Sequence, residues 1–174
     1  MKYHITLLIS IITLNLSFSQ CVNDFDFGDS SFGVSPDFSI GESLETGYIG
    51  TDYYDVIHML MPQYASDVDT DPPLPEILLD SIELVSITLI ENTTPDIIYT
   101  PEDLGLEIIC NNNGDSGNPC SFLAASQYCA SVEGIPNMAG NFNCTLTIKG
   151  WIGFLGSAIA EEASFDGITL EILD

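Results

Sequence analysis

Short runs of β-branched and aromatic residues, separated by turn formers, are the feature that most limits what this 174-residue chain can fold into. Such runs are typical of strands, and Gly, Pro, Asn and Asp between them are typical of turns. The strand-like runs cover residues 53–61, 77–90, 104–110, 129–132, 141–154 and 167–173. Only two short pieces, 124–126 and 158–163, are helix-like in composition. About seven strands with few helical residues predict an all-β sandwich.

The N-terminus has the pattern of a secretory signal peptide. Lys2 gives a positive start, an apolar stretch covers residues 5–16, and Ser17 and Ser19 are small residues at the −3 and −1 positions. The apolar stretch is shorter than the roughly 20 residues that span a bilayer. We therefore expect cleavage after Ser19, a single domain over residues 20–174, and no transmembrane segment in that domain.

The chain is strongly acidic, with 26 Asp and Glu, 2 basic residues and a formal net charge of −24. All the acidic residues lie after position 20, and Lys149 is the only Lys or Arg in that part of the chain. Such a surface repels nucleic acid and anionic lipid, because phosphate binding needs Lys and Arg. The composition is not that of a disordered chain, because 45% of residues are hydrophobic. Divalent cations are compatible with this charge.

Four cysteines lie close together in the second half of the chain: Cys110, Cys120, Cys129 and Cys144. Their spacings of nine, eight and fourteen intervening residues match neither a zinc site nor a Cys-x-x-Cys redox motif. An exported chain meets an oxidising compartment, where neighbouring thiols oxidise. We therefore expect these four residues to form disulfide bonds.

The connectivity of these cysteines stays open. One arrangement joins Cys120 to Cys129 and Cys110 to Cys144, and its main rival joins Cys129 to Cys144 across the turn at Pro136. Cys21 is the odd cysteine. It is free, lipidated or joined to a partner chain, although Gln20 stands where lipoprotein signals carry a small residue.

Asp67, Asp69 and Asp71 alternate as the carboxylates of a calcium loop do. Pro72 stands where an EF-hand needs Gly, and Leu78 where it needs a bidentate Glu, so an EF-hand is excluded. A looser calcium site and an ordinary solvated loop remain as the two alternatives.

Catalytic patterns are weak, and we expect no enzymatic activity. His58 is the only histidine after the leader, and its strand of alternating Tyr, Val and Met predicts a hydrogen-bonded structural role. Glu161 and Glu162 are adjacent, so on a strand they point to opposite faces and do not form a glycosidase pair.

Aromatic residues offer a candidate binding surface. Tyr48, Tyr53, Tyr54 and Tyr64 can line a surface for sugars or peptides, or else fill the core, which is the preferred interpretation. Trp151 is also expected in the core.

The segment 132–142, with sequence VEGIPNMAGNF, resembles the turn motif of immunoglobulin-like domains in exported proteins of Bacteroidetes, often associated with type IX secretion. FGVSPD at 32–37 and LDSIEL at 79–84 agree with the resemblance in order. It implies an antiparallel Ig-like sandwich in which Gly134 and Gly140 allow positive φ at a corner. Phe142 departs from the pattern, because it lacks the hydroxyl of a tyrosine corner.

The same resemblance bears on modification and on compartment. Asp80-Ser81-Ile82 resembles the acceptor of Bacteroidetes O-glycosylation, which makes Ser81 a candidate glycosylation site. No sorting domain follows the last strand-like run, so the cell surface, the medium and the periplasm all remain open as destinations.

The sequence thus predicts a non-enzymatic exported module for adhesion, binding or surface assembly, with an envelope or extracellular protein or a glycan as its partner. The alternative is a calcium-dependent carbohydrate-binding module. A building block of a larger assembly is a third alternative, which predicts self-association through exposed edge strands or Cys21.

Overall fold

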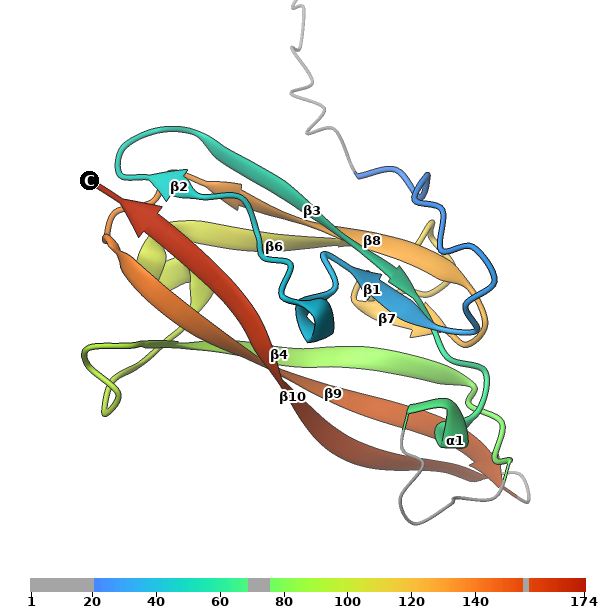
Figure 1. Cartoon of the computed structure of the whole chain (residues 1–174). Coiled ribbons are helices and arrows are strands. Elements are labelled where there is room, and N and C mark those ends of the chain that lie inside the picture. Colours follow the sequence, from blue (N-terminus) through green and yellow to red (C-terminus); the bar gives the residue numbers. More distant parts are fainter. Residues whose placement is uncertain (1–20, 69–75, 155–156) are drawn as a thin grey trace, which may run out of the picture.

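The computed structural model describes residues 21–68, 76–154 and 157–174, which form two facing β-sheets (Figure 1). Sheet A has the strand order β1-β3-β8-β6, with bounds β1 Gly33–Ser35, β3 Tyr53–Leu60, β8 Gln127–Gly134 and β6 Leu106–Asn111. Sheet B has the order β2-β10-β9-β4-β5, with β7 also paired to β4. Its bounds are β2 Gly47–Tyr48, β10 Ser157–Leu173, β9 Gly140–Phe154, β4 Ser81–Glu91, β5 Ile98–Tyr99 and β7 Ser121–Leu123.

The predicted fold class, an all-β antiparallel Ig-like sandwich, is confirmed. Every strand pair is antiparallel except β2 with β10. The described residues contain ten strands rather than about seven, because β1, β2, β5 and β7 have only two or three residues and carry no period of their own. The short helices are η1 Phe38–Ile40, α1 Ala65–Val68 and η2 Pro101–Leu104. The predicted leader, 1–19, lies outside the described residues, and no described helix is long and apolar enough to span a membrane.

The last strand is much longer than the sequence pattern indicates. β10 pairs with β9 from Ser157 to Ile172, so segment 158–163 is strand and its helix-like reading was wrong. Helix propensity is a weak preference, and pairing along a fifteen-residue neighbour overrides it. The register shifts between Asp166 and Ile168, where Gly167 has a φ of 121°.

The core lies between the two sheets and is built from alternate residues of each strand. The largest side chains buried there include Tyr128, Phe142, Leu104, Leu170 and Ile172. Trp151 was expected among them, and that expectation was wrong. It pairs with Ser81 and Ala160, and it is half-buried, with its indole N–H donating to Glu83 at 3.3 Å.

The cysteines pair differently from the prediction. Cys21 bonds to Cys129 and Cys110 bonds to Cys120, while Cys144 stays a buried thiol. Cys129 lies beside His58 and Asn111 on the outer face of sheet A, whereas Cys144 packs in the core against sheet B neighbours. These two faces do not meet, which excludes a Cys129–Cys144 bond. Cys110 faces the core, but its bond to Cys120 excludes the predicted Cys110–Cys144 pairing. Cys21 is therefore neither free nor available to a partner chain.

The N-terminal segment, residues 21–32, lies over part of the outer face of sheet A, as Figure 1 shows for the chain beside β3 and β8. The disulfide, a bond from the Asn23 amide to the Gln127 carbonyl at 2.8 Å and the Phe25 ring all hold it there. Phe25 stacks on His58 at a centroid distance of 5.4 Å. His58 thus has a structural role. Its Nδ1 is buried without a hydrogen-bond partner in the described chain, so the prediction that the imidazole is hydrogen-bonded was wrong for this atom.

Candidate functional site

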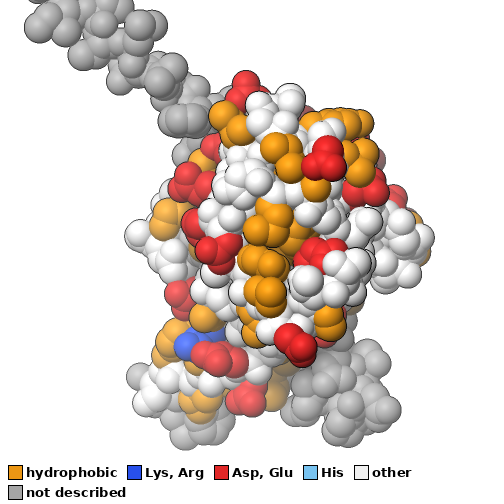
Figure 2. Space-filling model, turned by 90° about the vertical axis from the view of Figure 1, so that its left-hand side faces the viewer, with side chains coloured by type: hydrophobic (Ala, Val, Ile, Leu, Met, Phe, Trp, Pro, Cys, Tyr) orange, Lys and Arg blue, Asp and Glu red, His pale blue; other side chains and the backbone are white. Residues whose placement is uncertain are grey.

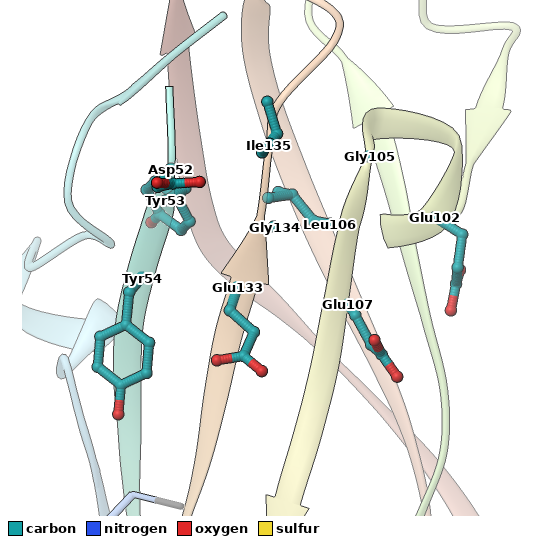
Figure 3. A pocket seen from close by; sticks show the side chains of 10 residues that line it. All are labelled: Asp52, Tyr53, Tyr54, Glu102, Gly105, Leu106, Glu107, Glu133, Gly134 and Ile135. Carbon is teal, nitrogen blue, oxygen red and sulfur yellow. The ribbon is translucent and has the colours of Figure 1, made fainter. Parts of the chain in front are cut away.

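An open groove of about 560 Å³ lies at one end of the outer face of sheet A (Figure 3). The start of β3, the end of β8 and the η2–β6 corner line it. We call it the acidic groove, and its lining residues are Asp52, Tyr53, Tyr54, Glu102, Gly105, Leu106, Glu107, Glu133, Gly134 and Ile135.

Two glycines bring the backbone segments that line the acidic groove close together. Gly105, after η2, has a φ of 78°, and a Cβ there would lie 2.4 Å from the Ile135 carbonyl oxygen. Gly134, at the end of β8, has a φ of 144°, and its Cβ would lie 2.3 Å from the Gly105 oxygen. Only glycine permits this approach, which the bond from the Ile135 N–H to the Gly105 carbonyl closes at 3.1 Å. The predicted positive φ is present at Gly134, while Gly140 is not among the residues with positive φ and instead leaves room for Glu91 and Phe142.

Strand register sets a row of side chains across the groove. Glu133 on β8 is paired with Tyr54 on β3 and with Glu107 on β6, so all three project from one face of the sheet. Figure 3 shows Tyr54, Glu133 and Glu107 pointing the same way, with Glu102 from η2 beyond Glu107. Tyr54 is 50% exposed. The row is thus one phenol followed by three carboxylates.

The groove carboxylates have no hydrogen bond or ion pair to any other described residue, and these are Asp52, Glu102, Glu107 and Glu133. Lys149, the one base in the described chain, lies on sheet B and holds Glu162 at 2.9 Å. Figure 2 shows acidic side chains on both sides of a hydrophobic band, with a single small basic area. The groove is therefore a concentration of uncompensated negative charge.

The polar side chains of the groove are hydrogen-bond acceptors or phenols. Burial, with Asp55 and Glu45 nearby, raises the pKa of Tyr53, whose hydroxyl donates to the Glu45 carbonyl at 2.9 Å. That phenol stays protonated at neutral pH and is not a base. The remaining polar side chains are carboxylates and the Tyr54 phenol, which bind cations and hydrogen-bond donors.

Of the three predicted calcium-binding residues, only Asp67 lies within the described part of the chain. Asp67 accepts the backbone N–H groups of Gln63 and Tyr64 at 3.1 and 2.8 Å through one oxygen, so it closes its own loop. Asp69 and Asp71 lie outside the described residues. Among the described residues, no group of three or more His, Cys, Asp or Glu is placed to hold a metal ion. Calcium binding by this loop stays a prediction.

Several other predicted residues gather on sheet B. Ser81 begins β4 between Trp151 of β9 and Leu123 of β7, and its glycosylation stays a prediction. Glu162 pairs with Lys149, while Glu161 is the residue before it on the strand and points to the other side, as expected.

Among the candidate binding tyrosines, Tyr53 is buried, whereas Tyr48 and Tyr54 are half exposed.

The acidic residues of the groove were missed by reasoning from the sequence. Glu107 and Glu133 are far apart along the chain and become neighbours only through the β6–β8 register. The sequence signal was two Gly corners beside acidic residues, Leu104-Gly105-Leu106-Glu107 and Glu133-Gly134, which becomes readable only when the strands are known to pair.

No family model and no curated protein matches this chain. The Bacteroidetes resemblance and an association with type IX secretion therefore stay predictions. Among solved structures, the chain is similar to the CssB subunit of colonization factor CS6 from enterotoxigenic Escherichia coli, complemented with a donor strand from CssA. The identity is 12%, the TM-score is 0.40, and the match covers 74% of this chain and 94% of that one.

Two further likenesses come from proteins of other classes. A PapD-like domain of human CEP192 is 8% identical with a TM-score of 0.41, over 90% of this chain and 96% of that one. A family 123 glycoside hydrolase from Clostridium perfringens is 13% identical with a TM-score of 0.37, over 83% of this chain and 26% of that one. Likeness at this level concerns sandwich architecture and carries no argument about activity.

Proposed function

We propose that this protein is a non-enzymatic, exported Ig-like module of the cell envelope or extracellular space that acts by binding. The two disulfides, Cys21–Cys129 and Cys110–Cys120, carry the compartment part of the proposal, because such bonds persist in oxidising compartments. The first of them ties the N-terminal segment to β8, so the attachment of that segment depends in part on oxidation.

The acidic groove supports the binding part of the proposal. It is an open feature at the end of a rigid sheet, where sandwich folds commonly present recognition surfaces. Its carboxylates are not used by the described fold, whereas His58, the natural candidate for a general base, is packed under Phe25 away from it.

The test is the intact mass of the protein from its native host, before and after reduction, together with its location in cell fractions. We expect a chain that begins at Gln20, gains four protons on reduction and is absent from the cytoplasm. A cytoplasmic protein with five reduced cysteines would overturn the proposal. A lipid-sized excess on Cys21 would contradict its bond to Cys129.

Surface assembly is a second candidate function, which the edge of β10 favours. β10 pairs with β9 along its length, but on its other side it pairs with β2 only at Ile172 and Leu173 within the described chain. A long free edge is a template for pairing with another strand. Sedimentation over a hundredfold concentration range tests this function, because a monomer at every concentration would exclude self-assembly through β10.

A further inference from the structure

The acidic groove contains like charges that the described fold brings together and leaves uncompensated. Glu107 and Glu133 are directly opposite on neighbouring antiparallel strands, where Cβ atoms are about 4.5–5.5 Å apart and like charges are destabilising. Glu102 adds a third carboxylate at the β6 side of the row. A cation placed between these residues relieves that repulsion.

The carboxylates elsewhere in the fold are mostly occupied. Glu83, Glu91, Asp115, Glu162 and Asp166 each accept a hydrogen bond or an ion pair from a named neighbour. The groove carboxylates have no such partner among the described residues, which is also true of isolated surface carboxylates such as Asp29 and Glu161. The groove differs from those positions because its register sets two unpartnered carboxylates, Glu107 and Glu133, directly opposite each other.

We propose that the acidic groove binds an extended segment of a partner protein that carries two or more Lys or Arg residues. This inference rests on the proposed binding function and names the partner chemistry. A second copy of this chain does not supply such a segment, because the whole sequence has only Lys2 and Lys149 as bases. The partner is therefore a different, basic chain.

The shape of the groove fits a main chain better than a single ion. Its carboxylates come from successive elements in a row, and strand neighbours are about 4.8 Å apart, so they extend across the sheet and do not converge. This agrees with the finding that no three acidic residues of the described chain are placed around one metal position.

Tyr54 favours arginine at one end of the row. Its half-exposed ring lies beside Glu133, so a guanidinium can contact the ring face and the carboxylate together. Side chains of an extended segment alternate between its two faces, so bases at alternate positions both face the row, whereas only one of two adjacent bases does. We therefore expect alternating Arg-x-Arg peptides to bind more tightly than peptides with adjacent bases.

The test measures binding of a dye-labelled peptide of alternating Arg and Ser by fluorescence anisotropy, at physiological salt. The groove variant is E107Q/E133Q, and the matched control is D29N/E161Q, which removes the same charge from the N-terminal segment and from β10. We expect the groove variant to bind about tenfold more weakly or worse, and the control to change less than about twofold, because only the first removes direct charged contacts. Thermal melts verify that both variants fold.

Two further readouts separate the outcomes. Y54A should reduce the preference for the Arg peptide over the corresponding Lys peptide, and spermine should compete only weakly. Equal weakening by both charge variants would show a general acidic surface and overturn the proposal. Equal competition by spermine or calcium would make the groove a small-cation site and also overturn it. Neither result bears on the compartment, which the mass measurement tests separately.

Discussion

The two outer faces of the sandwich have similar strands but treat their polar groups differently. On sheet B the outward residues of β9 meet partners on both sides: Thr145 donates to Asp166, Lys149 holds Glu162 and Trp151 donates to Glu83. On sheet A one end of the face is covered by the disulfide-linked N-terminal segment, and the other end is the acidic groove.

This contrast separates residues that support the fold from residues that the fold leaves available. Sheet B resolves its charges internally across neighbouring strands, which is how exposed sheet faces are stabilised. The groove on sheet A does not, and it keeps Glu107 and Glu133 opposite one another. Of the two outer faces, the acidic groove of sheet A is therefore the region that best suits the proposed binding of a partner.

The largest expected effect comes from the bond that covers sheet A. The Cys21–Cys129 bond spans 108 residues and Cys110–Cys120 spans 10. In the chain-entropy account, C21A/C129A should cost about 4–5 kcal/mol of unfolding free energy and C110A/C120A about 2–3. Urea unfolding measures both. If the first variant costs no more than the second, the bond does not constrain the long loop as proposed.

A second prediction concerns the core that both faces share. Burial raises the pKa of the Cys144 thiol to about 12, while an unfolded thiol has a pKa of about 8.5. The neutral thiol therefore contributes stability below pH 8.5 that is lost as the pH rises toward 12. By pH 10 the loss is about 2 kcal/mol.

The variant C144V should remove that loss. Comparing urea midpoints at pH 7.5 and 10 isolates Cys144, because Tyr53, whose pKa burial also raises, titrates in the unfolded chain only near pH 10. If the urea midpoint falls equally in wild type and in C144V between pH 7.5 and pH 10, ionisation of the Cys144 thiol is not the cause of the loss of stability at alkaline pH.

The sheets themselves were largely predictable from the sequence. The runs at 53–61 and 141–154 correspond closely to β3 and β9, because β-branched and aromatic residues bounded by turn formers report a local preference. The end of β10 was found, but residues 158–163 were not, since their alanines and glutamates favour helix and only β9 makes them a strand.

The disulfides and the groove were not predictable in the same way. Cys129 and Cys144 are close in sequence, but strand alternation and sheet assignment place them on different faces. Glu107 and Glu133 meet only through register, which hydrophobic pattern and turn geometry fix jointly. Non-local pairing therefore decided both the corrected cysteine connectivity and the candidate site.

The third prediction compares the same substitution on the two faces. E133Q should raise the unfolding free energy by about 0.2–1 kcal/mol, because it removes a like-charge pair with Glu107. E162Q should instead lower the melting temperature, because it removes the partner of Lys149. Urea and thermal unfolding of both variants measure the two signs. If both variants are destabilised, the groove carboxylates contribute to the fold and are not free for a partner.

The smallest expected effect is the pH dependence of sheet B. A hydrogen bond from Lys149 to Glu162, together with the charges of Glu162 and Glu83, holds the pKa of Lys149 above its usual value. The stability this provides is fully present below the unfolded pKa, about 10.4, and is lost as the pH rises through the folded pKa. K149M should therefore melt slightly below wild type at pH 8, and the difference should vanish at strongly alkaline pH.

Wild type and K149M share Tyr53 and Cys144, so the alkaline loss from the core cancels in their difference. A difference that stays constant with pH would mean that the Lys149 stem, not its charge, packs against the sheet. Sheet B would then owe its stability to apolar contact, and the two faces would differ in packing instead of in charge compensation. If the difference in melting temperature between wild type and K149M disappears with rising pH, charge compensation is the property that distinguishes the outer face of sheet B from the acidic groove of sheet A.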